Sequence, residues 1–241
     1  MSDIMTPISI EQPHQIAKEV CNSHQRDASE GCSFLSYLDS ILAYFSRSLM
    51  VKTVVVIFVE GETDKEFYQK LVKYIRDKRG GRLHCKVKYK NLKGVGNYKK
   101  NIANYLDQEV RANYPKATIN AALCYDTDVF QTGKKPRVDW KAVNRALWII
   151  GIKKIIHVKA VKSIEDWFLY DLDGLRARLK LSETVKIKQH GGLKEIQRLF
   201  RRAGETYIKG EKCKNLIKKL NFDVILPKIA REINGLIDIL I

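Results

Sequence analysis

The sequence has few cysteines and no pair of them at the spacing of a metal site. Its 241 residues include five cysteines, which are odd in number, scattered, and without a CxxC pair (Cys21, Cys32, Cys85, Cys124 and Cys213). Such a pattern argues against both a disulfide framework and a structural zinc site. We therefore expect a reducing compartment and a cytoplasmic protein.

Long apolar runs are also missing. No stretch approaches the ~20 apolar residues that span a bilayer. The first residues lack the basic-then-apolar order of a secretory signal peptide. These two absences predict a protein without a membrane partner.

Acidic residues are scarce relative to basic ones. The chain has 44 Lys and Arg against 27 Asp and Glu, for a formal net charge of +17. Such an excess indicates a polyanionic partner, of which nucleic acid is the commonest. Residues 78–106 contain nine basic and no acidic side chains, and we take six lysines of this run as candidate nucleic-acid-binding residues (Lys86, Lys88, Lys90, Lys93, Lys99 and Lys100). The alternative is that the run is an ordinary solvated face.

Residues 1–49 are expected to form a polar tail followed by an amphipathic helix. Residues 1–30 are polar, and apolar residues then recur at three- and four-residue steps (Phe34, Leu38, Ile41, Phe45 and Leu49). This helix would dock on the core or on a partner chain, and formation of a homo-oligomer is left open. Met50 precedes the first clear strand, so the first 49 residues could be an accessory extension.

Alternating strands and helices predict a parallel α/β core over residues 50–162. The expected strands are 53–59, 83–89, 119–125 and 154–158, and helices are expected at 63–78, up to Val110, and at 139–150. This order is typical of a four-stranded parallel sheet flanked by helices and joined by right-handed crossovers. Residues 163–241 are predicted to be a helical C-terminal part, with helices at 164–170, 193–203, 211–220 and from 224 to the end.

Acidic residues follow three of the expected strands. The first strand leads into Glu60-Gly-Glu-Thr-Asp64, the third into Asp126-Thr-Asp128, and the fourth into Ser163-Ile-Glu165-Asp166. Ligands of open parallel sheets collect at the carboxyl ends of the strands. Carboxylates that converge there would repel one another unless a cation such as Mg²⁺, which prefers oxygen ligands, neutralised them. The pattern favours metal-assisted phosphoryl transfer.

Each of these residues also has a simpler interpretation. Glu60 and Asp64 could be acids that the helix macrodipole favours, and Thr63 could cap that helix. The pair Asp126 and Asp128 could form a turn with local side-chain hydrogen bonds. Ser163 could be a helix N-cap, and Glu165 could merely begin that helix. Two histidines, His157 and His190, have no partner at ligand spacing.

The two strand-end motifs resemble a known family. A strand that closes on Glu60-Gly61, followed about sixty residues later by one that closes on Asp126-Thr-Asp128, is similar to the Toprim domain of topoisomerases, bacterial primases, recombination-mediator proteins and nucleases. The resemblance covers roughly residues 51–162 and implies a Rossmann-like fold. It implies a site for one or two Mg²⁺ or Mn²⁺ ions.

The segment Ser163-Ile-Glu165 narrows the resemblance to the OLD-family nucleases and to stand-alone Toprim proteins of bacterial defence systems. In that family a downstream lysine is matched by Lys209, although Lys212 and Lys214 are close and a surface lysine is the simpler interpretation. The resemblance implies the metal ligands Glu60, Asp64, Asp126, Asp128, Ser163 and Glu165. It also implies two catalytic residues: Glu60 would be a general acid or base, and Lys209 would neutralise developing phosphate charge.

The sequence departs from large OLD proteins because it has no Walker A pattern GxxxxGK[ST]. An ATPase would then be a separate subunit. We expect a metal-dependent nuclease that acts on nucleic acid, with DNA as the first candidate and antiphage defence as a candidate role. The alternatives are an RNA-processing Toprim nuclease and a catalytically silent nucleic-acid-binding subunit.

Overall fold

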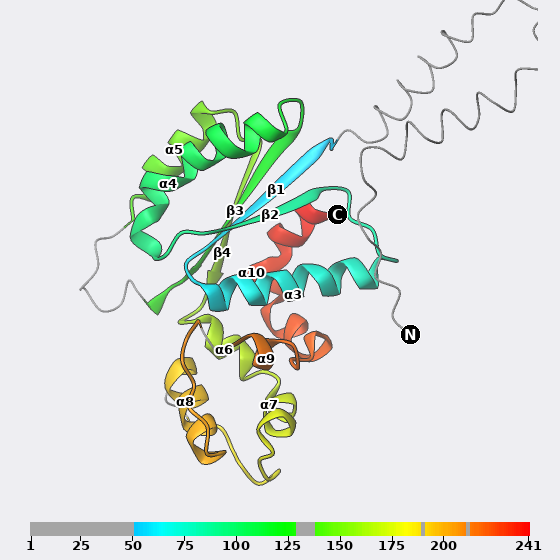
Figure 1. Ribbon diagram of the computed structural model, residues 1–241, viewed down its shortest axis with the longest axis vertical. Coiled ribbons are helices and arrows are strands. Elements are labelled where there is room, and N and C mark those ends of the chain that lie inside the picture. The colour runs from blue at the N-terminus through cyan, green and yellow to red at the C-terminus, as the bar shows by residue number, and fades with distance from the viewer. Residues whose placement is uncertain (1–50, 129–137, 189–190, 211–212) are drawn as a thin grey trace, which may run out of the picture. The chain divides into compact units, whose positions relative to one another are not determined.

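Four parallel strands form the sheet of this protein (Figure 1). The computed structural model describes residues 51–128, 138–188, 191–210 and 213–241, so the predicted tail and helix of residues 1–49 lie outside the described residues. The strands are β1 (Thr53–Val59), β2 (Lys86–Asn91), β3 (Thr118–Asp126) and β4 (Lys154–Ala160), in the order β2-β1-β3-β4. The predicted four-stranded parallel α/β fold is confirmed.

Helices cover both faces of the sheet, which explains why β1 is a continuous apolar run. Val55, Ile57 and Val59 belong to the core that β1 shares with α3 (Glu62–Lys78). The alternate residues, such as Val56 and Phe58, pack on the other face. That face is covered by η1 (Val95–Asn97), α4 (Tyr98–Asn104), the π-helical turn η2 (Tyr105–Arg111) and α5 (Trp140–Ile149). A strand that is buried on both sides needs apolar residues at every position.

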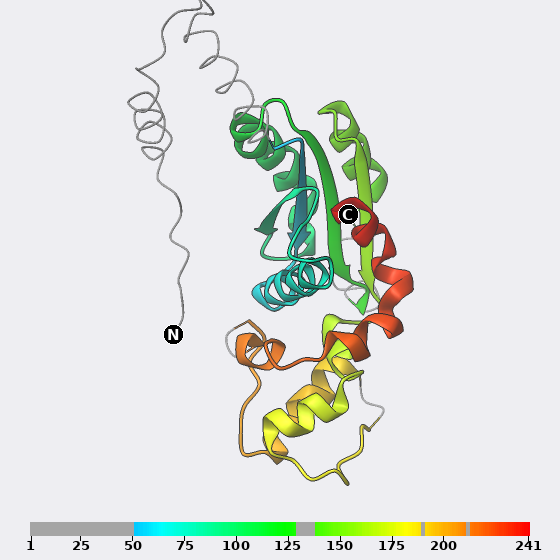
Figure 2. The same ribbon diagram turned by 90° about the vertical axis from the view of Figure 1, so that its right-hand side faces the viewer.

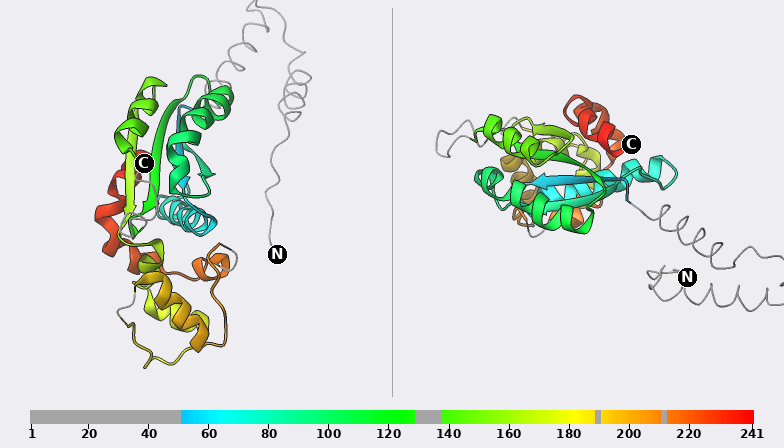
Figure 3. Two further views of the ribbon diagram at one scale, coloured as in Figure 1. Left: turned by 90° about the vertical axis from the view of Figure 1, so that its left-hand side faces the viewer. Right: turned by 90° about the horizontal axis from the view of Figure 1, so that it is seen from above.

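The C-terminal part is helical, as predicted. Its elements are α6 (Ile164–Phe168), α7 (Leu172–Leu179), α8 (Gly192–Arg202), α9 (Cys213–Ile217) and α10 (Phe222–Leu240). Helices α6 to α9 gather beyond the end of the sheet at which β3 and β4 finish (Figures 1 and 2). Helix α10 returns along β4 (Figure 3). The helical part therefore covers the carboxyl ends of the strands.

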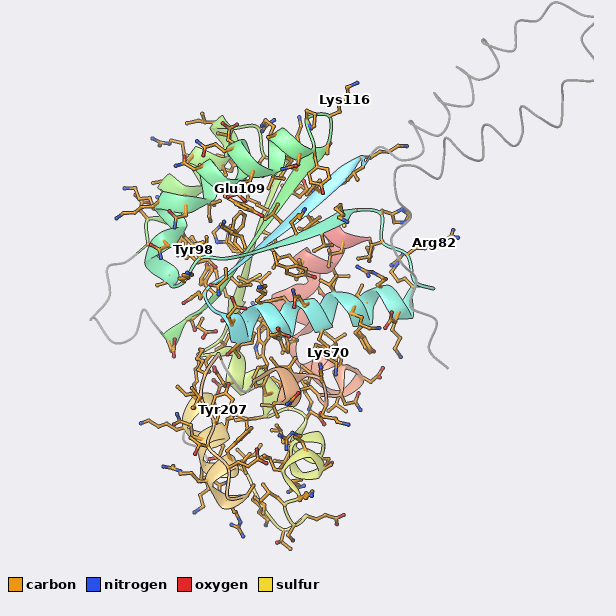
Figure 4. The ribbon with its side chains drawn as sticks, in the orientation of Figure 1. Lys70, Arg82, Tyr98, Glu109, Lys116 and Tyr207 are labelled. Atoms are coloured by element: carbon orange, nitrogen blue, oxygen red, sulfur yellow. The ribbon has the colours of Figure 1, made fainter. Side chains whose placement is uncertain are left out.

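An aromatic cluster joins this helical part to α3. The Phe67 ring lies 5.6 Å from Trp167, 5.7 Å from Phe168 and 5.2 Å from Phe222, measured between ring centroids. Each such pair contributes about 0.5–1.5 kcal/mol beyond the area it buries. Lys70, labelled in Figure 4, adds a hydrogen bond from its ammonium to the Leu220 carbonyl at 3.2 Å. These contacts fix the helical part against the helix that carries Asp64.

Several expected boundaries were wrong. Strand β2 begins at Lys86 rather than Leu83 and continues to Asn91. Helix α6 ends at Phe168, and α7, for which we had no prediction, follows it. Helix α3 begins at Glu62 with Gly61 as its N-cap, so Thr63 lies inside the first turn and does not cap it.

Among the described ranges, no helix is both long enough and apolar enough to cross a membrane.

Candidate active site

Two neighbouring strands bring Glu60 and Asp126 together. Glu60 directly follows β1, Asp126 is the last residue of β3, and these strands pair in parallel. Glu60 Oε1 accepts a hydrogen bond from the Asp126 backbone N–H at 3.1 Å. Asp126 is only 4% exposed, whereas Glu60 is half-buried. This bond places Glu60 and Asp126 side by side at the carboxyl edge of the sheet, where α/β proteins bind ligands.

The first turn of α3 adds Asp64 to this edge. Asp64 is 3% exposed, and within the described residues its Oδ2 atom has no hydrogen-bond partner. A Cβ atom added to Gly61 would lie 3.2 Å from the same oxygen, so the absence of a side chain at Gly61 leaves room for the carboxylate. A buried carboxylate oxygen without a partner is costly, and a bound cation is one way to satisfy it.

Helix α6 contributes Glu165, which is fully buried. The N-terminus of this helix contacts the sheet directly, because the Ile164 backbone N–H donates to Asp126 Oδ1 at 2.9 Å. The hydroxyl of Tyr207 donates to Glu165 Oε1 at 3.2 Å and orients that carboxylate. Tyr207, labelled in Figure 4, comes from the segment between α8 and α9. The sequence had no signal for this contact, because 42 positions separate the two residues.

Lys209 contacts two of the buried carboxylates with its ammonium. Its ammonium lies 3.2 Å from Asp126 Oδ2 and 3.4 Å from Glu165 Oε2. The backbone N–H of Gly210 donates to Thr63 Oγ1 at 2.9 Å, which ties the segment of Lys209 to the first turn of α3. The Thr63 hydroxyl thus accepts a hydrogen bond from Gly210 and does not cap α3. The Lys209 side chain remains 41% exposed, so solvent or substrate can reach it.

Burial shifts the pKa values of the titratable groups in this cluster. Desolvation raises the pKa of Asp64 to about 7, with Lys209 opposing the rise and the charges of Glu60 and Glu165 adding to it. Desolvation likewise raises the pKa of Asp126 to about 7, helped by Asp64. Burial lowers the pKa of Lys209, but the charges of Glu165, Asp126 and Asp64 outweigh it and raise that pKa overall. The single positive charge of Lys209 therefore cannot neutralise Asp64, Asp126 and Glu165 together.

The residues of the cluster meet some of the requirements for binding a divalent cation. Mg²⁺ is usually held by one or two carboxylates, with waters and substrate phosphate completing its shell. The unpartnered Asp64 Oδ2 and the adjacent Asp126 supply such oxygens. Among the described residues, however, no three His, Cys, Asp or Glu side chains are already arranged to hold a metal ion. The Lys209 ammonium already bridges two of the carboxylates.

Two of the predicted ligands lie outside this cluster. Asp128 is exposed, and its backbone N–H donates to the Lys162 carbonyl at 2.9 Å. Ser163 is buried next to the cluster, but its hydroxyl donates to Asp166 Oδ2 at 3.0 Å in the capping box of α6. Ser163 is therefore the N-cap of α6, as its simpler interpretation predicted.

The predicted nucleic-acid-binding lysines divide into three places. Lys86, Lys88 and Lys90 lie on β2, at an edge of the sheet. Lys88 lies over the Tyr114 ring at 5.5 Å, and Lys90 lies over the Tyr105 ring at 4.2 Å and pairs with Glu109 at 3.5 Å. Lys99 and Lys100 are exposed in the first turn of α4, and Lys93 follows β2 at the carboxyl edge. Of the six, Lys93 is the one whose chain position is beside the acids.

Comparisons with known proteins add one similarity of structure. No protein-family model matches the sequence, and no curated protein is significantly similar to it. The chain is similar in structure to the C-terminal region of the Xanthomonas campestris pv. campestris OLD protein, at 13% sequence identity and a TM-score of 0.33, over 78% of this chain and 96% of that chain. OLD is also the family to which the segment Ser163-Ile-Glu165 narrowed the resemblance of the sequence. At this identity and TM-score the similarity carries no argument about function, which rests on the residues described above.

Proposed function

We propose that this protein is a divalent-metal-dependent nuclease that hydrolyses phosphodiester bonds in nucleic acid, with DNA as the first substrate to test. The observation that supports it most is the convergence of Glu60, Asp64, Asp126 and Glu165 around one lysine at the carboxyl edge of the sheet. A strongly basic chain has no need of buried acids for solubility. Such acids at a strand-end edge are suited to binding a cation that in turn binds phosphate.

The chain's own residues would have separate roles in this reaction. Asp64 and Asp126 would hold Mg²⁺ or Mn²⁺, and Glu165, oriented by Tyr207, would complete the carboxylate set. When bound, such an ion polarises a phosphoryl oxygen, activates water or stabilises the leaving oxygen. Glu60 is half-buried and reachable, so it is the candidate general acid or base.

Lys209 would contact the substrate in addition to stabilising the folded protein. Its ammonium is partly exposed and lies between the buried carboxylates and the solvent. With the carboxylates neutralised, the Lys209 ammonium would be free to turn toward a phosphate whose negative charge grows in the transition state. The basic surface on β2 and α4 would hold the nucleic-acid backbone without reading its sequence.

The test is cleavage of labelled DNA and of labelled RNA, each with EDTA, Mg²⁺ or Mn²⁺. Wild type should cleave only with metal, and Glu60→Gln and Asp126→Asn should each lower the rate at least about 100-fold. Asp77→Asn is the matched control, because Asp77 is an exposed acid at the end of α3. Cleavage that persists in EDTA, or that survives both site variants, would overturn the proposal. Cleavage of RNA alone would assign the RNA-processing alternative.

One observation favours a second candidate, a nucleic-acid-binding subunit without catalysis. Lys209 bridges Asp126 and Glu165, and the described residues contain no ready-made group of three metal ligands. A silent subunit would bind DNA with an affinity that falls steeply with salt, and no divalent ion would produce cleavage. The same assay separates the two candidates.

A further inference from the structure

Three lysines of the described residues have a left-handed backbone: Lys93 (φ 58°), Lys162 (φ 66°) and Lys180 (φ 51°). A residue with a Cβ atom pays about 1–2 kcal/mol for this conformation, so it persists only where neighbouring contacts impose it. Lys180 has an ordinary reason, because it terminates α7, where left-handed residues are common. Lys93 and Lys162 end no helix. Each lies two residues beyond an edge strand of the sheet.

Lys162 is held on both sides of its backbone. Its N–H donates to Thr127 Oγ1 at 2.8 Å, and its carbonyl accepts from the Asp128 N–H at 2.9 Å. A third hydrogen bond, from the Thr127 N–H to the Ala160 carbonyl at 3.0 Å, joins the same two loops. The loops that follow β3 and β4 thus hold Lys162 at a fixed place next to Asp126. Its side chain is exposed.

Lys93 is held in a parallel way at the other edge. Its N–H donates to Asn91 Oδ1 at 2.8 Å, and its carbonyl accepts from Asn97 Nδ2 at 3.2 Å. The next N–H, of Gly94, donates to the Glu60 carbonyl at 2.9 Å, so this loop is tied directly to a residue of the candidate active site. The Lys93 side chain is exposed as well.

The strand order places the acids between these two lysines. Lys93 follows β2 and Lys162 follows β4, whereas Glu60 and Asp126 belong to the two central strands. Three strand spacings separate the edge strands, or roughly 14 Å. None of the ion pairs found among the described residues involves Lys93 or Lys162. The backbone would be satisfied better by glycine or asparagine at either position, so what lysine adds there is its charge.

We propose that Lys93 and Lys162 are a pair of phosphate-binding residues that hold a nucleic-acid backbone across the candidate active site, one on each side of the carboxylates. This inference rests on the proposed function and names how its substrate is positioned. A lysine ammonium is a compact point charge on a flexible stem, suited to a phosphate oxygen. Because the backbone of each lysine is held by hydrogen bonds, the positions that its ammonium can occupy are limited. Two such charges on opposite sides of the acids would define the path of the strand.

The experiment measures binding of a labelled DNA duplex to the full chain in EDTA, by fluorescence anisotropy over a range of salt concentrations. The variants are Lys93→Asn and Lys162→Asn, because asparagine tolerates the left-handed backbone and removes the charge. Lys180→Asn is the matched control, with the same residue type and the same backbone conformation at the end of α7. Thermal unfolding of each variant establishes that it is folded.

Each site variant should lose about fivefold or more in affinity, and the slope of log K against log salt should become shallower by about one unit. The Lys180→Asn variant should match wild type. If either asparagine variant fails to fold, Lys93→Gly and Lys162→Gly are used, because glycine also suits the left-handed backbone and removes the charge, and they should show the same loss of affinity and of slope. Slopes that do not differ between the site variants and Lys180→Asn would overturn the inference while leaving metal-dependent cleavage standing. Failure of wild type to bind the duplex would also overturn the inference, whereas the proposed function is tested separately by metal-dependent cleavage of DNA and RNA.

Discussion

Lys209 Nζ lies 3.2 Å from Asp126 Oδ2, although 83 positions separate the two residues in the chain. The contact joins the segment after α8 to the end of β3. The same ammonium also lies 3.4 Å from Glu165 Oε2. Together the two contacts place the Lys209 ammonium between two buried carboxylates. The stability of the fold and the chemistry of the site therefore depend on the same contact.

Replacing this lysine should destabilise the metal-free protein. The Lys209→Met variant leaves Asp126 and Glu165 buried without their cation, and we expect a loss of about 2 kcal/mol in the free energy of unfolding at pH 8. Urea unfolding measures it, with Lys180→Met as an exposed control. Mg²⁺ should restore part of the loss in Lys209→Met by taking the place of the ammonium. An unchanged unfolding midpoint would show that the carboxylates do not need the lysine.

The buried aspartates predict how stability depends on pH. An unfolded aspartate has a pKa near 3.9, whereas burial raises the pKa of Asp64 and of Asp126 to about 7. Between about pH 4 and pH 7 these two groups therefore bind more protons in the folded chain than in the unfolded chain, so their contribution to the free energy of unfolding falls as pH rises. Each group contributes at most about 1.4 kcal/mol per pH unit.

Urea unfolding at a series of pH values, in EDTA, checks this dependence. The double variant Asp64→Asn, Asp126→Asn should lose most of the decrease, because neither amide titrates. Saturating Mg²⁺ should flatten the wild-type profile, since a cation binds the ionised carboxylates and stabilises the folded state. A double variant whose pH profile coincides with that of wild type would assign the dependence to other groups.

Gly192 at the start of α8 should not tolerate a side chain. A Cβ atom there would lie 2.3 Å from the Asp166 backbone nitrogen and 2.6 Å from Asp166 Oδ2. Gly192→Ala should therefore move α8 away from α6 and cost about 2–4 kcal/mol of unfolding free energy. Gly96→Ala is the control, because nothing lies within 4 Å of its added Cβ. Equal unfolding midpoints for the two variants would contradict the packing of α8 on α6.

The hydroxyl of Tyr207 should contribute to stability and activity separately from its buried ring. Tyr207→Phe keeps the buried ring and removes the donor that lies 3.2 Å from Glu165 Oε1, so we expect a loss of about 1–2 kcal/mol in stability. Cleavage should slow as well, because Glu165 is then less well oriented. Tyr170→Phe, at an exposed position, serves as the control. Full activity and stability in Tyr207→Phe would remove Tyr207 from the account.

The sheet could be predicted because β1 and β3 are apolar at nearly every position, which only a strand buried on both faces requires. Strand β2 was placed less well, because its alternating lysines resemble solvated chain and its register depends on pairing with β1. Helix α7 was missed because it is short, charged and contains Gly174. Its N-terminus depends on Asp171, which accepts a hydrogen bond from the Gly174 N–H at 3.0 Å.

From the residues alone, the candidate site could be predicted only as far as the ends of the strands, and Lys209 was identified only through the family resemblance. Glu60 and Asp126 follow directly from β1 and β3, and parallel pairing brings them together. The closure of the site by Lys209 and Tyr207 depends on how the helical part packs on α3, which no local pattern encodes. Asp128 shares the DxD motif with Asp126 but faces solvent, because the chain turns at Thr127 toward the loop of Lys162.

The central claim is that the buried carboxylates bind a divalent cation. Its most direct test is Mn²⁺ binding, measured as the loss of the electron paramagnetic resonance signal of free Mn²⁺ on titration with wild type, Asp126→Asn and Asp77→Asn. Wild type and Asp77→Asn should bind one or two ions with the same affinity, and Asp126→Asn should bind at least about tenfold more weakly. Equal binding by wild type and Asp126→Asn, or none by wild type, would contradict the account.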